Sequence, residues 1–547
     1  MPERTTPDRR IFPIGAGVPI PAGATAETAG GKAFNLMRLA AMGLQVPSAF
    51  VLSIDFCAAY LAGGRAAIPE LREALIANVH MLEQRAGLFF GDARRPLLLS
   101  VRSGAARSMP GMMDTVLNVG LCDGTVRGLI RQTGNARLAW DCYRRLVQAF
   151  AEIVHGCDAA PFDAAIRRAV TAQDVDSVRD LDSAGLEELT QEFLRIFSTQ
   201  TGAKFPQDPA DQLVAVAEAV FRSWQSPRAI QYRHMNGLDS LAGTAVTVQT
   251  MVFGNGGVMS GAGVGFTRDP ALGGNVLYVD FLPNAQGEDV VSGRQSIVHP
   301  DQLQRLFPAI CRELEQTRVA LEKEFRDVQE FEFTVQEGKL YLLQTRRAKR
   351  TGWAALRHAV DMVREGVIEP AEALQLLADY DVRGLARDRL APRPGETPIC
   401  RASPASFGIA VGGVAFDPQR AQAMAASGKS VILVRQDLAT ADLEGIAAAA
   451  GIVTARGGRT SHAAVVARQL NKVCLVGCAD LLIDATSCKA RLGGYDVAEG
   501  DLLSLDGESG AIYLGEIPVV RERPTELLRQ VESWRVAPAP QPAEQPA

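Results

Sequence analysis

The chain has 547 residues, of which 47% are hydrophobic and 22% are charged, as in ordinary soluble globular proteins. This length is too great for one hydrophobic core and predicts roughly three or four domains of about 100–200 residues each. The formal net charge is −5 and no long run of lysine and arginine occurs, so nucleic acid is excluded as an expected partner.

The N-terminus is polar, and no later stretch approaches the roughly 18 continuous apolar residues of a membrane span. We therefore expect a cytoplasmic protein with no membrane partner. The nine cysteines include no CxxC pair, and the two closest in sequence, Cys474 and Cys478, lack histidines at the spacing of a metal site. Reduced, buried thiols are expected in preference to disulfides or zinc ligands.

The first 345 residues alternate glycine-punctuated apolar runs with amphipathic stretches, which is typical of a mixed α/β or α+β domain. Residues 97–101 and 340–343 predict buried strands, and residues 211–224 repeat apolar side chains at helical spacing. Residues 351–380 keep the helical spacing except at Pro370. They predict a helical connector with a pivot at this proline.

A third unit is expected after the connector, with a strand at 430–434, a helix after Thr460 and a hairpin at about 503–514. The tail is rich in proline and alanine and has too little apolar content to fold, so it should be disordered.

Residues 457–468 read Gly-Gly-Arg-Thr-Ser-His-Ala-Ala-Val-Val-Ala-Arg, in which Thr460 is a good N-cap for an alanine-rich helix. His462 would lie in the first turn of that helix, where backbone N–H groups and the helix dipole favour an incoming phosphate. A neutral imidazole is a competent nucleophile toward phosphorus. The local residues also fit a histidine that only caps or packs the helix.

Three other segments carry groups suited to a nucleotide and its metal. Gly30-Gly31-Lys32 couples two glycines to a cation without being a Walker A loop, and Arg102 ends a predicted strand before a glycine-containing loop. Glu332 and Gln344 have a spacing that suits adjacent antiparallel strands presenting oxygen ligands to Mg²⁺. Each residue taken singly also fits an ordinary structural or surface role.

Together these segments resemble the pyruvate, phosphate dikinase family. The run around His462 is similar to the phosphohistidine motif shared with phosphoenolpyruvate synthase and the sugar-phosphotransferase enzyme I, and the other segments match, in order, the ATP-grasp half of the dikinases. The resemblance covers nearly all of residues 25–515. It implies an α/β and α+β multidomain fold, with an ATP-grasp nucleotide-binding domain and a swivelling β/β/α phosphohistidine domain.

The resemblance also implies a role for each candidate site residue, with Mg²⁺ as cofactor and ATP as substrate. The nucleophile would be His462, flanked by Thr460 and Ser461, and Arg346 would neutralise charge on the transferred group. Glu332 and Gln344 would hold Mg²⁺. The nucleotide-binding set would be Lys32, Arg102, Glu288, Glu330, Glu332 and Gln344. Glu330 departs from the aspartate usual in the family and reaches one methylene further.

The expected domains are an ATP-grasp domain at 1–345, a helical linker at 346–395, a phosphohistidine domain at 396–518 and a disordered tail at 519–547. A helical subdomain is expected at about 120–210 within the first. In the family a barrel that binds pyruvate or phosphoenolpyruvate follows the histidine domain. Because a proline-rich tail stands there in this sequence, we expect a separate barrel subunit or another acceptor, and an enzyme incomplete without that partner. Whether two copies of the chain form a homodimer is left open by the sequence.

The leading hypothesis is a dikinase-type phosphotransferase. ATP, with inorganic phosphate, would phosphorylate His462, giving AMP and pyrophosphate, and the phosphoryl group would pass to pyruvate or another acceptor. One alternative is an enzyme like phosphoenolpyruvate synthase, or a small-molecule phosphotransferase, with a different acceptor. The other alternative is a non-catalytic, nucleotide-binding regulatory protein.

Overall fold

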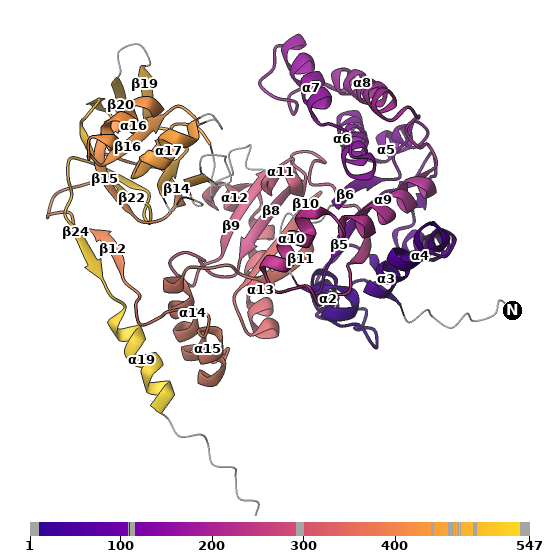
Figure 1. Cartoon of the computed structure of the whole chain (residues 1–547), viewed down its shortest axis with the longest axis horizontal. Helices are drawn as coiled ribbons and strands as arrows, with labels where there is room; N and C mark the ends of the chain where they lie inside the picture. Colours follow the sequence, from indigo (N-terminus) through magenta and orange to yellow (C-terminus); the bar gives the residue numbers. More distant parts are fainter. Residues whose placement is uncertain are drawn as a thin grey trace, which may run out of the picture. The chain divides into compact units, whose positions relative to one another are not determined.

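The computed structural model describes residues 10–107, 109, 115–291, 300–438, 442–457, 464, 466–467, 470, 472–484 and 489–536. The chain divides into two compact units, the first made of Met1–Ser260 with Phe333–Arg346 and the second of Gly261–Glu332 with Arg347–Ala547 (Figure 1). Both units mix helices and sheets, as the expected α/β and α+β multidomain fold requires. Within the described ranges, no helix has the length and apolar character needed to cross a bilayer.

The first unit is built on a five-stranded sheet of order β1-β2-β7-β5-β6. Its strands are β1 (Ile11–Ile14), β2 (Ala49–Leu52), β5 (Leu99–Gly104), β6 (Thr115–Val119) and β7 (Ala245–Thr250). β5 runs antiparallel to β7, with Leu99 opposite Thr250 and Gly104 opposite Ala245. A small parallel pair, β3 (Phe89–Phe90) and β4 (Pro96–Leu97), precedes β5. β4 and β5 together confirm the strand expected at 97–101.

Ten α-helices described in this unit surround the sheet. They are α1 (Ala26–Ala29), α2 (Gly31–Ala41), α3 (Ile54–Gly63), α4 (Ile68–Ala86), α5 (Val126–Thr133), α6 (Ala136–His155), α7 (Ala160–Ala172), α8 (Ser183–Thr201), α9 (Pro209–Ser223) and α10 (Pro227–Met235). α9 confirms the helix expected at 211–224. Asn135, Asp182 and Asp208 cap α6, α8 and α9 by accepting hydrogen bonds from backbone N–H groups of the first turn.

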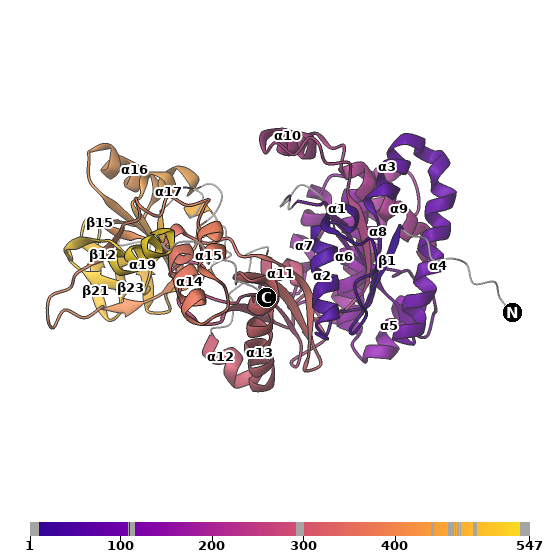
Figure 2. The ribbon, with the colours of Figure 1, turned by 90° about the horizontal axis from the view of Figure 1, so that it is seen from below.

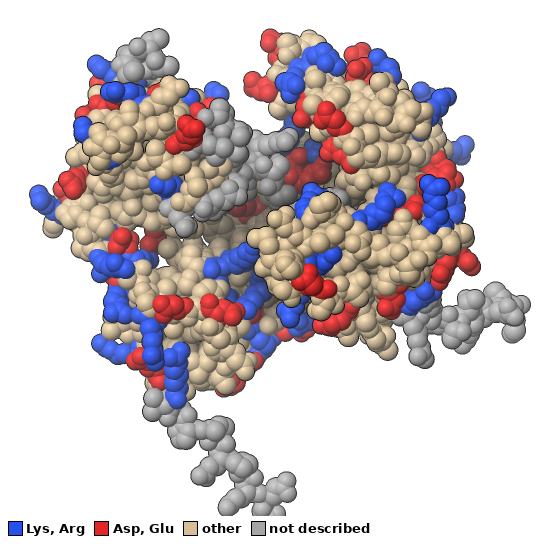
Figure 3. Space-filling view, in the orientation of Figure 1, with Lys and Arg blue, Asp and Glu red and all other residues tan. Residues whose placement is uncertain are grey.

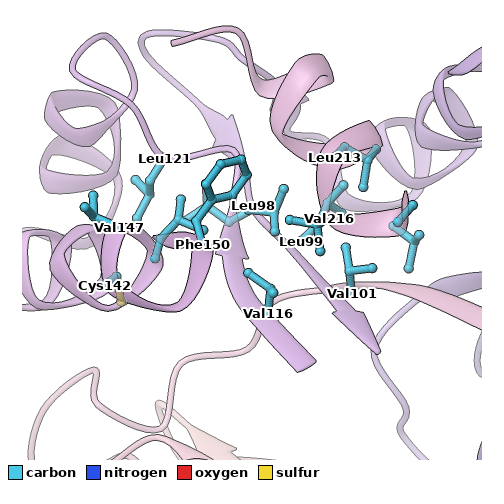
Figure 4. Close-up of a cluster of buried hydrophobic side chains, with 14 of the residues drawn as sticks. Leu98, Leu99, Val101, Val116, Leu121, Cys142, Val147, Phe150, Leu213 and Val216 are labelled. Atoms are coloured by element: carbon cyan, nitrogen blue, oxygen red, sulfur yellow. The ribbon is translucent and has the colours of Figure 1, made fainter. Parts of the chain in front are cut away.

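The core of the first unit lies where β5 and β6 pack with α6 and α9. Figure 4 shows Val101 and Val116 of the strands with Phe150 of α6 and Val216 of α9, and all four are fully buried. Because α6 and α9 lie far apart in sequence, this shared apolar cluster joins the helices of residues 126–201 to the sheet.

A four-stranded sheet of order β11-β10-β8-β9 follows. Its strands are β8 (Gly261–Phe266), β9 (Tyr278–Pro283), β10 (Gln329–Gln336) and β11 (Lys339–Arg347), and its helices are α11 (Gly287–Val291), α12 (Pro300–Leu306) and α13 (Pro308–Phe325). β11 confirms the strand expected at 340–343. The buried guanidinium of Arg268, after β8, bonds to the carboxylates of Glu322 on α13 and Glu365.

The expected connector contains α14 (Gly352–Arg364) and α15 (Pro370–Leu376), so its helical character is confirmed. The interruption expected at Pro370 is confirmed, because α14 ends at Arg364 and a separate helix begins at Pro370, while a pivot there stays a prediction. The proline lies in the first turn of α15, where its missing N–H costs no hydrogen bond, and a capping box between Glu369 and Glu372 fixes this start. Pro370 therefore begins a helix here.

The disorder expected from residue 519 onward is wrong for residues 519–536. These residues form β24 (Val519–Glu522), paired with β12 (Arg387–Leu390), and α19 (Thr525–Val536). Figure 2 shows α14, α15 and α19 side by side, and Val531 and Trp534 of α19 pack into their apolar cluster. Helically spaced apolar residues before the proline-rich end therefore bury one face of α19. Residues 537–547 lie outside the described ranges.

An eight-stranded sheet of order β13-β23-β22-β15-β16-β17-β18-β14 forms the rest of the second unit. Its strands are β13 (Cys400–Arg401), β14 (Ser403–Ser406), β15 (Ile409–Ala415), β16 (Val431–Arg435), β17 (Gly451–Thr454), β18 (Val473–Val476), β22 (Leu502–Asp506) and β23 (Ala511–Leu514). The strand expected at 430–434 and the hairpin expected at 503–514 are confirmed by β16 and the β22–β23 pair.

The two faces of this sheet bury different clusters. Val431 and Leu433 of β16 face the side covered by α16 (Pro418–Ala426) and α17 (Leu443–Ala448), while Ile432 and Val434 face the other side. Residues from β19 (Leu481–Asp484), β20 (Lys489–Leu492) and β21 (Tyr495–Ala498) join the second cluster. The edge strands β13 and β14 are separated in sequence by Ala402 alone, so the sheet curls round and its two edges approach each other.

Candidate functional site

The first unit holds the start of α2 directly against the end of β5. Gly31 donates a backbone hydrogen bond to the oxygen of Ala105, 2.9 Å away. A Cβ atom added at Gly30 would lie 2.1 Å from the backbone oxygen of Gly104, so only glycine permits this approach. The glycine pair therefore brings exposed Lys32, in the first turn of α2, beside the loop that follows Arg102 on β5.

A second set of contacts joins α2 to β11. Asn35 donates a hydrogen bond from Nδ2 to the backbone oxygen of Thr345, 3.0 Å away. Thr345 stands between Gln344 and Arg346, two of the residues expected in the site. In the first unit, α2 therefore contacts both the loop after β5 and the backbone of β11 at Thr345.

β10 and β11 are neighbours in their sheet, as expected from the spacing of Glu332 and Gln344. The turn between them contains Glu337 and Gly338, both with positive φ. Glu330 and Glu332 are two residues apart on β10 and so face the same side of the strand. Glu330 is buried and Glu332 is half-buried. Gln344 is also buried.

Glu330 also lines a cavity of about 680 Å³ in the second unit, together with Asp280 of β9 and with Lys349. Just beyond β11, Arg347 and Arg350 both form ion pairs with Asp327, at 2.8 Å and 2.6 Å. These pairs anchor the chain on either side of the β10–β11 hairpin. The carboxylates of β10 therefore sit on a strand whose ends are fixed.

Glu288 lies in the first turn of α11, in the second unit, and is exposed. His462, Thr460 and Ser461 lie outside the described residues. After them, Ala464, Val466 and Ala467 are buried in the cluster on the α16–α17 side of the eight-stranded sheet. The segment that carries His462 is thus attached by apolar residues on its C-terminal side.

Sequence reasoning assigned no role to Asn35, although it lies one helical turn after Lys32. Its only signal was an amide side chain on a helix face that also carries a candidate phosphate ligand. Thr244 is a second missed residue, because its Oγ1 accepts a hydrogen bond from the backbone N–H of Gly104 at 3.1 Å. Both residues position the loop and helix that carry Lys32 and Arg102.

Among the described residues, no three His, Cys, Asp or Glu side chains are grouped closely enough to hold a metal ion. The donors near the site are carboxylate and amide oxygens, which suit a hard cation such as Mg²⁺. Mg²⁺ commonly takes one or two protein ligands and completes its shell with water and substrate phosphates. The residues present therefore fit a magnesium ion that arrives with a nucleotide.

Two stretches of the chain match models of known protein domains. Residues 64–307 match the pyruvate phosphate dikinase AMP/ATP-binding domain, and residues 428–510 match the mobile domain of phosphoenolpyruvate-utilising enzymes. The chain therefore combines a segment similar to a nucleotide-binding domain with a later segment similar to a mobile domain.

Three relatives narrow the class. Pyruvate, phosphate dikinase from Clostridium symbiosum is 42% identical over 509 residues, which are 92% of this chain and 58% of that protein. The chloroplastic enzyme from Mesembryanthemum crystallinum is 40% identical over 532 residues, 97% of this chain and 56% of the relative. Pyruvate, phosphate dikinase 2 from Zea mays is 42% identical over 518 residues, 93% and 58% of the two chains.

Over the length that it shares with these relatives, the chain is similar to the pyruvate, phosphate dikinases. It spans a little more than half the length of each of them.

Proposed function

We propose that this chain transfers phosphoryl groups from ATP to its own His462. The imidazole attacks the β-phosphorus and the bond to the α-phosphoryl oxygen breaks, so AMP leaves and a pyrophosphoryl group stays on the histidine. Inorganic phosphate then attacks the terminal phosphorus, and pyrophosphate leaves. One phosphoryl group remains on His462 for transfer to an acceptor, which in relatives named pyruvate, phosphate dikinase is expected to be pyruvate.

The observation that supports this proposal is that α2 contacts both the chain after β5 and the backbone of β11 within the first unit. Lys32 and Arg102 supply charge for the phosphates, and the close packing of Gly30 on Gly104 fixes their spacing. Arg346 follows directly after the residue that Asn35 binds. Three segments that are far apart in sequence are thus held together, and each of them carries a residue proposed to bind the nucleotide. This arrangement supports a site for a multiply charged ligand.

We also propose that Glu332 and Gln344 hold Mg²⁺, with Glu330 on the same side of β10. Bound Mg²⁺ would neutralise phosphate charge while the bond between the β-phosphorus and the oxygen of the α-phosphoryl group breaks. The chain's own residues would orient the nucleotide. The ammonium of Lys32 is a compact charge, and the guanidinium of Arg102 can donate two hydrogen bonds at once to phosphate oxygens. Glu288 remains a proposed nucleotide contact on the family resemblance.

Transfer onward requires an acceptor site. A separate barrel subunit as the acceptor, and an enzyme incomplete without it, stay predictions, as do the cytosolic location and the domain boundaries at 345, 395 and 518. Adding pyruvate alone to labelled protein, and then pyruvate with a candidate barrel protein, would measure whether the label is discharged in cis or in trans.

The test of the proposal uses ATP labelled at either the β- or the γ-phosphorus, with Mg²⁺ and with or without inorganic phosphate. We expect acid-labile label from β-labelled ATP to remain on the protein after phosphate is added, and label from γ-labelled ATP to leave as pyrophosphate. His462→Asn should abolish both while nucleotide binding persists.

Each alternative gives a different pattern. Release of the γ-label as inorganic phosphate, without a phosphate requirement, would favour the reaction with water. Binding of ATP with no label on the protein from either position would favour a regulatory nucleotide-binding protein. Label that survives in His462→Asn would move the nucleophile elsewhere.

A further inference from the structure

The second unit contains a close pair of thiols that no step of the proposed reaction uses. The Sγ atoms of Cys400 and Cys478 are 3.8 Å apart, although the residues are 78 positions apart in sequence. Cys400 belongs to β13 at one edge of the eight-stranded sheet, and Cys478 follows β18 near the other edge. The curling of this sheet therefore brings the two sulfur atoms together.

We propose that Cys400 and Cys478 form a reversible dithiol–disulfide pair that is oxidised by a small peroxide. The Sγ atoms would have to close from 3.8 Å to the roughly 2.05 Å of a disulfide, a change within reach of side-chain rotation. Neither Cys400 nor Cys478 is in a disulfide in this structure, so the pair is in its reduced form.

The burial of the pair restricts the oxidants that can reach it to small molecules. Both residues lie in one apolar cluster, where Cys478 is fully buried and Cys400 keeps 8% of its surface exposed. The thiol hydrogen bond from Cys400 lowers the pKa of Cys478, and the same bond with burial raises the pKa of Cys400. Cys478 is therefore the better nucleophile and Cys400 the proton-bearing partner.

The reaction balances with hydrogen peroxide as the oxidant. The Cys478 thiolate attacks one peroxide oxygen, the O–O bond breaks, and hydroxide leaves as water after taking a proton, which gives a sulfenic acid. The Cys400 thiol then attacks the Cys478 sulfur and displaces a second water. Two protein thiols and one peroxide thus give one disulfide and two waters, and an added dithiol reverses the change by exchange.

The fold excludes the neighbouring cysteine from this pair. Cys474 is four residues before Cys478 on β18, but its side chain lies in the cluster on the α16–α17 side of the sheet. Cys400 and Cys478 lie in the cluster on the opposite side. Cys474 is therefore a matched control, because it is equally buried and close in sequence but points away from Cys400.

The disulfide would also restrain the chain that leads to His462. The backbone N–H of Cys478 donates to the oxygen of Thr454 at the end of β17, 2.9 Å away. Gly477 stands against Gly457, since a Cβ added there would lie 2.9 Å from the Gly457 oxygen. Resting on the proposed function, we infer that the cross-link slows phosphorylation of His462 by tying these strand ends to β13.

The test treats the folded full chain with hydrogen peroxide, blocks remaining thiols with N-ethylmaleimide in denaturant, and maps disulfides by mass spectrometry of peptides. We expect a peptide pair linking Cys400 to Cys478, two hydrogens lighter than the reduced pair and lost on treatment with dithiothreitol. Cys474→Ser should form the same cross-link, and Cys400→Ser should not. Failure to find the 400–478 link in oxidised folded protein, while other thiols are oxidised, would overturn the pair.

The functional arm uses labelling from β-labelled ATP and is read separately. Oxidised protein should label several-fold more slowly than reduced protein and recover with dithiothreitol, whereas Cys400→Ser should be insensitive to peroxide. A mapped disulfide with an unchanged labelling rate would overturn the effect on His462. Absence of labelling in the reduced protein would instead contradict the proposed function and leave the disulfide result standing.

Discussion

Asn35 of α2 donates a hydrogen bond to the backbone oxygen of Thr345 on β11 across 310 residues of sequence, at 3.0 Å. This bond fixes the helix that carries Lys32 against the strand that carries Gln344 and Arg346. On its other side the same helix is held to β5 by the bond from Gly31 to Ala105. α2 is therefore the element that sets the distance between the proposed phosphate ligands on separate strands.

Asn35→Ala should separate positioning from stability. Losing one part-buried hydrogen bond should cost about 1 kcal/mol of unfolding free energy. Loosening α2 from β11 should lower the labelling rate of His462 by about tenfold, because small misplacements of charged groups are expensive in transfer reactions. The measurement is labelling with β-labelled ATP at saturating Mg²⁺. Asn78→Ala removes a comparable bond, to Ala74 on α4, and should leave the rate unchanged.

Gly30→Ala tests the close approach of α2 to β5. Gly30 has φ +80° and ψ 146°, a conformation that only glycine adopts at low cost, and an added Cβ would lie 2.1 Å from the Gly104 oxygen. Gly23→Ala is the matched control, because Gly23 has φ +85° but nothing within 4 Å of an added Cβ. The Gly23→Ala protein should lose only about 1–2 kcal/mol of unfolding free energy through backbone strain.

Gly30→Ala should lose more stability than this and should also weaken ATP binding, measured by titration calorimetry. Equal affinities for ATP in the Gly30→Ala and Gly23→Ala proteins would show that the approach of α2 to β5 does not build the nucleotide site.

Glu332→Gln tests the proposed metal ligand with little change in size. Because an amide oxygen binds Mg²⁺ more weakly than a carboxylate, the Mg²⁺ concentration that gives half-maximal labelling should rise about tenfold or more. Glu337→Gln changes the same residue type in the exposed turn of the same hairpin and should leave the Mg²⁺ dependence unaltered. If both variants respond to Mg²⁺ as the unmodified chain does, Glu332 is a structural strand residue.

The strands at 97–101, 340–343 and 430–434 could be predicted because continuous apolar runs bounded by glycine and polar residues are a local signal. Contacts such as that between Asn35 and Thr345 could not, since nothing in either segment specifies the other. The cysteines illustrate the same limit. Sequence spacing singled out Cys474 and Cys478. Cys474 lies on β18 and is buried on one side of the sheet, whereas β18 ends at Val476 and Gly477 follows with φ +65°, so Cys478 is buried with Cys400 on the other side.

The wrong prediction of disorder for residues 519–536 had a local cause. α19 was hidden by the proline- and alanine-rich residues after it, although Val531 and Trp534 keep helical spacing. The interruption at Pro370 was predicted correctly, although the sequence alone does not show that this proline begins the second helix. The candidate site was predictable to the extent that its residues lie in motifs long enough to match a family.

His358 should make the second unit sensitive to acid. Its ring lies fully buried on α14, and Nε2 donates to the backbone oxygen of Asp269 at 3.0 Å. Burial, followed by the charges of Arg350 and Arg268, lowers the pKa of His358 to about 3. The folded protein thus keeps this imidazole neutral at pH values where an unfolded chain, with a pKa near ~6.5, takes up a proton.

Between pH 6.5 and pH 3 the unfolded state therefore binds more protons, so the unfolding free energy falls as the pH falls through this window. The loss should be about 2 kcal/mol between pH 6.5 and pH 5, at roughly 1.4 kcal/mol per pH unit. His358→Gln keeps an N–H donor without a titrating ring and should lose less stability over the same interval, measured by urea unfolding at both pH values. His234→Gln, at an exposed histidine, should behave like the unmodified chain. An imidazole resonance of His358 that shifts between pH 7 and pH 5 in the folded protein would contradict the buried neutral ring.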